Sequence, residues 1–326
     1  MQKPLISRVT GIAALLSVVA LVLSACSSGG SPAPATVTVT GPAGQTTVVT
    51  SAAPKSSTKP SKPAKPVHIK TLNADGVQYG VGMPVIAFFS KKIKSAKALQ
   101  DATKVTTDGK PLPGAWYFET SSYYKGYPIE GHWRPQEYWP AHSRVHVDIP
   151  AKGLSAGGNM AYDDSLTLDY DIGAKNIAVV NDASHHIVVT SDGRKKFDFP
   201  VSLGARKTPT SRGIKVIMEK GVSICMHGPG YHECGVKYTQ RLTYGGEYLH
   251  SAPWNTYNIN HGIDSSNGCT NMHNADAKKL YGFLEVGDVV DYPNANGPAM
   301  QLGMGYGDWN IDWNTWLTGG LVSTTA

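Results

Sequence analysis

Cys269 is the residue whose surroundings best fit a chemical role. It lies in the run Ser265-Ser266-Asn267-Gly268-Cys269-Thr270-Asn271, among small polar residues instead of the apolar residues that normally surround a structural cysteine. A thiol in such a setting acts as a nucleophile once it is held as the thiolate. Gly268 removes steric bulk beside the sulfur, so that backbone N–H groups can approach a reacting carbonyl as an oxyanion hole requires. The alternative is a buried, inert cysteine.

A nucleophilic thiol needs a base or an imidazolium partner. His250 lies nineteen residues upstream, and the strand-like run 247–249 would deliver it at its end. On spacing alone, His261 and His273 are rival partners. The residues by themselves leave the choice among these three histidines open.

Cys225 and Cys234 have a different context, because they flank eight residues with a Pro-Gly turn at their middle. Outside the cytoplasm this arrangement predicts a disulfide across a hairpin-like loop. A loop of this size would contribute about 2–3 kcal/mol by chain entropy. Two alternatives remain: two free thiols, or a structural metal site that adds His227 and His232 as ligands.

The first 25 residues have the layout of a signal peptide. Lys3 and Arg8 form a basic region, and the apolar run 12–23 that follows is too short to span a bilayer comfortably. The run ends in Leu23-Ser24-Ala25-Cys26, which resembles the lipobox of bacterial lipoproteins. That resemblance implies lipidation of Cys26 and anchoring to the membrane. The alternative is an ordinary signal peptide that contains a cysteine.

Residues 26–67 are rich in Ser, Thr, Pro and Lys and have almost nothing to bury, which predicts a disordered tether. The formal net charge of the chain is +6. Lys3, Arg8 and the five lysines of residues 26–70 exceed this surplus by one, so the remainder carries a charge of −1. The basic charge therefore belongs to the tether, where it favours anionic lipid or wall polymers. Nucleic acid is not expected as a partner.

The elements that must position Cys269 are mainly β-strands. Short β-branched or aromatic runs separated by turn residues predict a β-sandwich over residues 68–173. These runs are 84–89, 115–119, 144–149 and 165–172. A second series of strands follows at 177–180, 186–190 and 194–201, with Asp192-Gly193 as a hairpin turn.

One helix is predicted directly after Cys269. Asn274 can serve as its N-cap, and an apolar face follows at i, i+3, i+4 and i+7. That face consists of Ala277, Leu280, Tyr281 and Leu284. A final strand is expected at 289–292. The second module, over residues 174–293, is therefore expected to be β-rich with few helices.

Several motifs, in order along the chain, resemble one family. His250-Ser251-Ala252-Pro253-Trp254 and Ser266-x-Gly268-Cys269-x-Asn271 are similar to the signature of L,D-transpeptidases of the YkuD type. The segment 134–140 resembles part of the immunoglobulin-like domain of actinobacterial members, and 307–316 resembles their C-terminal extension. The resemblance implies an immunoglobulin-like β-sandwich at 68–173, a YkuD-type catalytic domain at 174–293 and a Trp-rich extension at 294–326.

The resemblance also implies a role for each matching residue. Cys269 would be the nucleophile, His250 the base, and Ser251 the residue whose backbone orients that histidine. The implied substrate-binding residues are Met226, Tyr231, Gly245, Gly246, Trp254 and Asn271, with plain packing as the alternative for Met226, Tyr231 and Trp254. Asn267 is a departure, because the family usually has histidine there. Since an amide cannot titrate, we expect Asn267 and Gly268 to modulate the rate of the site.

The implied function is acyl transfer on peptidoglycan stem peptides, which forms 3→3 cross-links through a cysteinyl thioester. Two-step covalent catalysis of this kind needs no metal or organic cofactor. We expect a monomer that is anchored outside the cell membrane, reaches into the wall and is sensitive to carbapenems. The alternatives are an L,D-carboxypeptidase, a protein-anchoring enzyme, and a non-catalytic wall-binding lipoprotein. A metal-dependent hydrolase is disfavoured, because His142 and His146 would lie about 13 Å apart along a strand.

Overall fold

The computed structural model describes residues 36–40, 46–50, 62–121, 123–228, 231–301 and 303–325. The chain divides into two units, Met1–Ser61 and Lys62–Ala326. The predicted signal peptide at 1–25 and the lipidation site Cys26 lie outside the described residues. No helix within the described ranges is both long and apolar enough to cross a bilayer.

The first unit contains a strand pair where the sequence predicts a disordered tether. Strand β1 (Thr36–Thr40) pairs antiparallel with β2 (Thr46–Thr50). The two segments read TVTVT and TTVVT. Their β-branched residues favour extended backbone, although they offer little apolar surface. Disorder was predicted because the segment has almost no residues to bury, and the preference of its β-branched residues for extended backbone was not taken into account.

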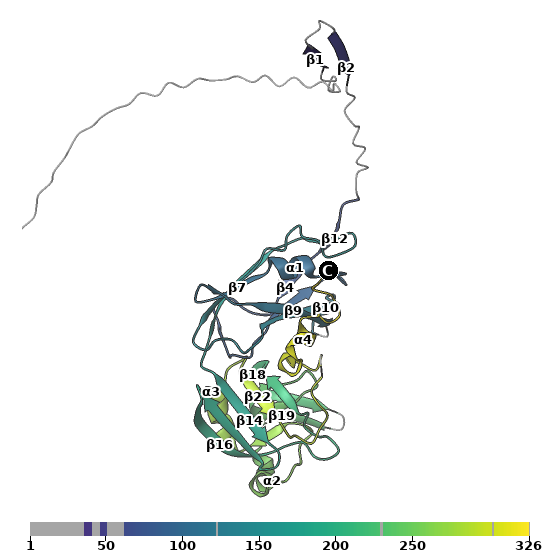
Figure 1. The fold of residues 1–326 in the computed structure, drawn as a ribbon. Coiled ribbons are helices and arrows are strands. Elements are labelled where there is room, and N and C mark those ends of the chain that lie inside the picture. The colour runs from purple at the N-terminus through teal and green to yellow at the C-terminus, as the bar shows by residue number, and fades with distance from the viewer. Residues whose placement is uncertain are drawn as a thin grey trace, which may run out of the picture. The chain divides into compact units, whose positions relative to one another are not determined.

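Residues 62–172 form the predicted sandwich (Figure 1). One sheet has the order β4-β6-β10-β9 and the other the order β5-β13-β11-β7-β8, while β3 pairs with β12. The elements are β3 Lys65–Val67, β4 Ile69–Thr71, β5 Gln78–Tyr79, β6 Val85–Phe89, α1 Lys97–Ala102, β7 Lys104–Thr107, β8 Lys110–Pro111, β9 Gly114–Thr120, β10 Ile129–Pro135, β11 Arg144–Ile149, β12 Met160–Tyr162 and β13 Leu166–Ile172. Because β3 begins at Lys65, the ordered fold starts inside the segment predicted as tether.

Strand β10 is buried along its whole length. Ile129 and Trp133 belong to the sandwich core. The alternate residues Glu130, His132 and Arg134 point to the opposite face of the sheet, since successive side chains of a strand alternate. They are nevertheless almost inaccessible to solvent, with exposed fractions of 0%, 3% and 2%. A segment far along the chain therefore has to cover this face.

The second module is built on one nine-stranded sheet, with the order β17-β22-β14-β15-β16-β21-β20-β19-β18. Only the β14–β22 and β20–β21 pairs are parallel among its described strands. The elements are β14 Asn176–Asn181, β15 His186–Ser191, β16 Arg194–Ser202, β17 Gly213–Val216, β18 Glu219–Gly228, β19 Tyr231–Arg241, β20 Tyr248–Ser251, η1 Pro253–Asn255, α2 Thr256–His261, β21 Thr270–Met272, α3 Asn274–Phe283 and β22 Val289–Tyr292.

Helix α3 begins where the sequence predicts a helix, but its N-cap is His273 and not Asn274. The Asn274 carboxamide does not cap the helix, because its Oδ1 accepts a hydrogen bond from the Ser251 hydroxyl at 3.0 Å. Ala277 and Leu280 of the predicted apolar face are buried. They pack in a cluster with core residues of the sheet.

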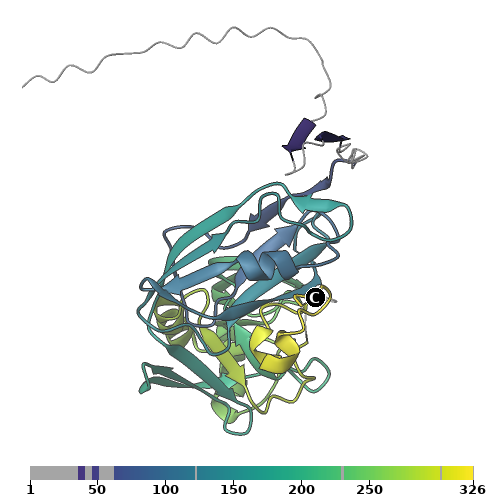
Figure 2. The same cartoon turned by 45° about the horizontal axis from the view of Figure 1, so that its top comes forward.

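The C-terminal extension covers the polar face of β10 and contacts both modules (Figures 1 and 2). It contains η2 (Asp308–Asn310) and α4 (Trp313–Trp316). The indole of Trp316 donates to the Ala115 carbonyl on β9 at 2.8 Å. The Asn310 carboxamide accepts a hydrogen bond from the Ile214 N–H on β17 and donates one to the Ile214 carbonyl, both at 2.7 Å.

The sandwich meets the second module through backbone hydrogen bonds at Gly80. The Gly80 N–H donates to the Val286 carbonyl, and the Gly82 N–H donates to the Gly287 carbonyl, both at 2.8 Å. A Cβ on Gly80 would lie 2.2 Å from the Asp288 backbone nitrogen. Glycine is required here because two backbones approach closely, not because of a special dihedral angle.

We therefore expect Gly80→Ala to lower the free energy of unfolding by about 3 kcal/mol, since backbone on both sides must shift to admit a methyl group. Gly282 of α3 is the matched control, because it is exposed and a Cβ there meets nothing within 4 Å. Gly282→Ala should be neutral or stabilise by up to about 1 kcal/mol. Urea unfolding followed by fluorescence measures both changes. Equal stability of the two variants would contradict the tight interface.

Candidate active site

The loop before Cys269 is held to the end of β16. The N–H groups of Ser265 and Ser266 donate to the Leu203 carbonyl at 2.9 and 3.0 Å. The Thr210 hydroxyl donates to the Gly268 carbonyl at 3.0 Å. Gly268 has a φ of +104°, a backbone conformation that L-residues with a side chain rarely adopt.

The structure adds a backbone requirement for glycine at position 268. A Cβ at this position would meet atoms of Glu247 and Pro209 only at 3.6–3.8 Å, which is ordinary contact. The positive φ therefore requires glycine at this position. The predicted approach of backbone N–H groups to a reacting carbonyl beside Gly268 stays a prediction. The N–H of Gly268 donates to the Ser266 hydroxyl at 3.1 Å, so this amide is already engaged in the structure.

Parallel pairing of β20 with β21 brings the thiol and an imidazole to one face of the sheet. His250 lies opposite Asn271 in the register, and Leu249 lies opposite Thr270. Cys269 precedes Asn271 by two positions, so both side chains point to the same face as that of His250. His261 and His273, the rival partners in the sequence, instead bond to the Tyr257 carbonyl and to Asn260.

A cavity of about 260 Å³ opens on this face. It is lined by Met226, Glu233, Val236, His250, Trp254, Asn255, Ser265, Ser266, Asn267, Cys269 and Asn271. Six of the residues selected from the sequence are therefore gathered around one volume: Met226, His250, Trp254, Asn267, Cys269 and Asn271. Glu233, Asn255, Ser265 and Ser266 complete the polar lining. Ser265 and Ser266 belong to the polar run around Cys269, whereas no sequence motif had marked Glu233 or Asn255.

The thiol of Cys269 is nearly enclosed. It packs with Met226 and Val236, and Sγ donates to the Gly246 carbonyl at 3.5 Å. Burial is the largest cause that raises the pKa of Cys269 to about 12, while a backbone hydrogen bond from Tyr248 opposes the shift. The resting site therefore holds the neutral thiol at physiological pH.

The imidazole of His250 is also neutral at rest, because burial lowers its pKa. Its Nδ1 lies 3.0 Å from the Ser251 carbonyl oxygen. A carbonyl can only accept, so Nδ1 carries the proton and donates, which leaves a lone pair on Nε2. The Trp254 ring lies stacked beside the imidazole at a centroid distance of 6.1 Å, although 59% of Trp254 is exposed.

Two of the remaining predicted residues lie in the turn before β20. Gly246 has a φ of +96° and offers its carbonyl to the thiol, while Gly245 precedes it. Tyr231 begins β19, but its side chain lies outside what the structure describes.

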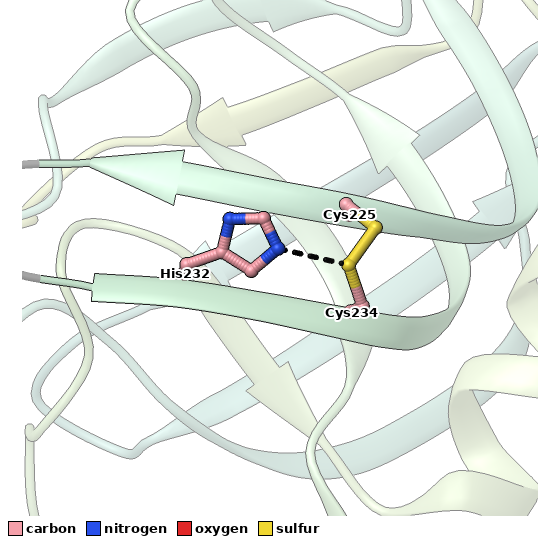
Figure 3. Close-up of side chains that lie close together, drawn as sticks. All are labelled: Cys225, His232 and Cys234. Atoms are coloured by element: carbon pink, nitrogen blue, oxygen red, sulfur yellow. Dashed lines mark hydrogen bonds between the residues drawn. A yellow bond between two sulfur atoms is a disulfide. The ribbon is translucent and has the colours of Figure 1, made fainter.

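The hairpin of β18 and β19 covers the cavity and carries a disulfide between Cys225 and Cys234 (Figure 3). The disulfide confirms the predicted pairing and rules out the two free thiols and the metal site. Two bonded sulfurs are not thiolates and cannot act as the ligands of a zinc site. In the register, Met226 lies opposite Glu233, directly beside the disulfide, and both line the cavity. The covalent link thus restrains the two strands that cover Cys269.

A buried ion pair below the site was not anticipated from the sequence. Lys215 is completely buried, and its Nζ donates to a Glu247 carboxylate oxygen at 2.5 Å. The same carboxylate accepts from the backbone N–H and the hydroxyl of Ser211, both at 2.8 Å. The two charges shift the pKa of the Cys269 thiol in opposite directions. Lys215 lowers this pKa and Glu247 raises it. The two residues are 32 positions apart, and no spacing rule links them.

Because a raised pKa reduces the thiolate fraction at any given pH, we expect iodoacetamide to alkylate Cys269 slowly in the native protein. At pH 8 the rate should lie on the order of a hundredfold or more below that of an ordinary thiol. It should rise steadily with pH up to pH 10. Mass spectrometry of the Cys269 peptide measures the rate, with the urea-unfolded protein as control. A fast rate that is constant from pH 6 to pH 8 would instead indicate a preformed thiolate–imidazolium pair.

Breaking the buried ion pair should be costly, because it leaves a buried charge without its partner. We expect Glu247→Gln to cost about 3 kcal/mol of stability. The double variant Glu247→Gln with Lys215→Met should lose clearly less stability than the sum of the losses in the two single variants. Asp101→Asn is the control, since Asp101 pairs with Lys97 on an exposed surface, and its cost should stay within about 1 kcal/mol. Additive costs in urea unfolding would show that Lys215 and Glu247 act independently.

Comparisons with known proteins agree with this arrangement. Residues 175–291 match the family model of the YkuD L,D-transpeptidase catalytic domain, and residues 33–155 match that of a bacterial Ig domain. L,D-transpeptidase 2 of Mycobacterium tuberculosis is 29% identical over 268 residues, covering 78% of this chain and 64% of that protein. L,D-transpeptidase 5 of the same species is 31% identical over 263 residues, covering 77% and 56%. The chain thus spans less than two thirds of each of these relatives.

Among solved structures, the L,D-transpeptidase LdtMt1 in complex with imipenem superposes with a TM-score of 0.56 at 25% identity. The superposition covers 68% of this chain and 97% of that structure. The mainly β fold, the Ig-type sandwich and the catalytic module predicted from the sequence are confirmed. The chain is therefore similar to the mycobacterial L,D-transpeptidases, with residues 33–155 matching a bacterial Ig domain and residues 175–291 matching a YkuD catalytic domain.

Proposed function

We propose that this protein is a peptidoglycan L,D-transpeptidase that forms 3→3 cross-links, with Cys269 as nucleophile and His250 as base. The observation that carries the proposal is the cavity in which a buried thiol and a buried imidazole share one face of β20 and β21. The family of the domain supplies the reaction class.

The burial of both groups favours activation within the substrate complex. Nε2 of His250 takes the proton of the Cys269 thiol as the sulfur attacks the carbonyl between the third-position diamino acid and D-alanine. The C–N bond then breaks, and the imidazolium gives its proton to the departing amine of D-alanine. A thioester remains on Cys269. The Ser251 carbonyl, by accepting from Nδ1, keeps the imidazole in the tautomer that can accept this proton.

The second half of the reaction uses the same groups. The side-chain amine of another stem peptide attacks the thioester, the C–S bond breaks, and His250 passes the amine proton back to sulfur. Glu233 on the covering hairpin lines the cavity, and its carboxylate would attract a cationic amine. This charge favours an amine acceptor over water. Asn271 and Asn267 supply amide groups beside the thiol that can bind the stem peptide.

The position of the protein in the cell follows from the same reaction. Peptidoglycan lies outside the membrane, so the export signal at 1–25, lipidation at Cys26 and the basic segment that follows would hold a monomeric enzyme at the membrane, facing the wall. The solved relative that binds imipenem supports carbapenem acylation of Cys269 in this chain. No metal or organic cofactor enters the reaction as proposed.

Intact-mass spectrometry tests the proposal directly. Purified protein should gain the mass of imipenem, whereas Cys269→Ala should gain nothing. His250→Ala should be acylated about a hundredfold or more slowly, while His261→Ala, which alters a histidine outside the cavity, should match the unchanged protein. Loss of acylation on His261→Ala but not on His250→Ala would refute the assigned pair.

A disaccharide-tetrapeptide substrate separates the alternative activities. A cross-linked dimer that lacks one D-alanine supports transpeptidation. Tripeptide alone would indicate an L,D-carboxypeptidase, and coupling only to an added protein amine would indicate an anchoring enzyme. If neither an imipenem adduct nor any product forms, the chain is a non-catalytic wall-binding protein and the proposal is wrong.

A further inference from the structure

A second group of chemically capable side chains lies away from the active site, between the sandwich and the C-terminal extension. Glu119 comes from β9, Glu130 and His132 from β10, and Asp308 from η2. Their exposed fractions are 4%, 0%, 3% and 2%. None of them lines the active-site cavity.

Three of these side chains face one another at ion-pair distance but without a hydrogen bond. Nε2 of His132 lies 3.6 Å from a Glu130 oxygen and 3.8 Å from a Glu119 oxygen, beyond hydrogen-bond length. Both Glu130 oxygens and His132 Nε2 are buried without a hydrogen-bond partner among the described residues. Buried polar atoms left in this way are rare and require an explanation.

The spacing of these atoms fits the coordination shell of a metal ion. Zinc ligands lie about 2.0–2.2 Å from the ion at tetrahedral angles, which places neighbouring donors roughly 3.3–3.6 Å apart. The two separations around Nε2 are close to this range. The donor atoms of Glu119, Glu130 and His132 all lie within 4.8 Å of one another.

The fourth residue supplies a feature that is typical of metal-binding histidines. Nδ1 of His132 lies 2.6 Å from a carboxylate oxygen of Asp308. A histidine that binds a metal usually donates its other ring N–H to a carboxylate, which fixes the tautomer and turns the lone pair towards the ion. Here this bond aims Nε2 of His132 at the two glutamates.

Charge gives the cluster a reason to take up a cation. Three carboxylates lie in a region that water scarcely reaches, and burying them uncompensated is costly. The Arg134 guanidinium is a favourable charge for Asp308, but it lies among Trp309, Trp313 and Trp316 and bonds to backbone carbonyls of Pro135, Gln136 and Ile311. Without a metal, burial raises the pKa of Glu119 and the neighbouring carboxylates raise that of His132, so protons offset part of the negative charge. A divalent ion would take the place of these protons, as metal binding generally does.

We propose that Glu119, Glu130 and His132 bind a structural Zn²⁺ ion, with Asp308 orienting the histidine. Imidazole and carboxylate ligands are a donor set that zinc accepts. The fourth position would be taken by water or by the second oxygen of a glutamate. Because the ligands come from β9 and β10 and the orienting carboxylate from η2, the ion would tie the C-terminal extension to the sandwich and leave catalysis to Cys269.

The full chain tests the proposal after purification without chelators and dialysis against Zn²⁺ followed by zinc-free buffer. Elemental analysis should find about one zinc per chain. After removal of zinc with EDTA, restoring Zn²⁺ at a hundredfold excess over its Kd should raise Tm by about 5 °C or more. His132→Gln should lose both the bound zinc and the Tm rise. Absence of zinc and of any Zn²⁺-dependent Tm shift in the unchanged protein would overturn the proposal.

Two further variants keep the result interpretable. Glu119→Gln removes one ligand and one negative charge, so the metal-free protein should be at least as stable as the unchanged chain while its Tm no longer responds to Zn²⁺. His232→Gln alters an exposed histidine beside the disulfide and should keep the zinc. Zinc lost from His232→Gln but retained by His132→Gln would place the ion on the covering hairpin and refute the assignment.

Discussion

Three residues of β20 pair in parallel with three residues of β21, and the arrangement of the active site depends on this pairing. The two strands come from segments separated by a short helix and a loop. Their register sets His250 opposite Asn271 and so places Cys269 on the face of the imidazole. A shift of one residue would turn either side chain to the other face of the sheet, because the side-chain period of a strand is two.

Burial also sets the protonation states of Cys269 and His250. It raises the pKa of the thiol and lowers that of the imidazole, so both groups are neutral at rest. A neutral thiol is protected from incidental oxidation, since the thiolate is the reactive form. The disulfide-linked hairpin above the cavity adds to this enclosure. In the proposed reaction, the same covering strands would therefore link access of the substrate to activation of the thiol.

The C-terminal extension shows how polar residues come to be buried between modules. Its η2 and α4 segments cover β10 and reach β17, so one short stretch of chain contacts both folded parts. Close backbone contact at Gly80 adds a second junction. The Glu119–Glu130–His132–Asp308 cluster lies within the first of these junctions, where an ion would stabilise the extension on the sandwich.

The sequence alone determined the elements whose signals are local. Runs such as 144–149 and 289–292 alternate or cluster β-branched residues and form the strands predicted there. Cys269 and His250 were also found from local motifs, and Cys225 with Cys234 from their flanking of a turn. The strands β1 and β2 were missed because β-branched residues can pair without a core, and the N-cap of α3 was misplaced because Ser251 engages the Asn274 side chain.

Without the family motif, the residues left the partner of Cys269 open among three histidines. The tertiary structure shows that His250 shares the cavity with Cys269, since strand pairing is a long-range choice. It also joined Lys215 to Glu247 and His132 to Asp308, residues 32 and 176 positions apart. Each of these polar side chains looks like an ordinary surface residue in the sequence. Its burial results from segments that pack over it from elsewhere in the chain, and no local pattern carries that information.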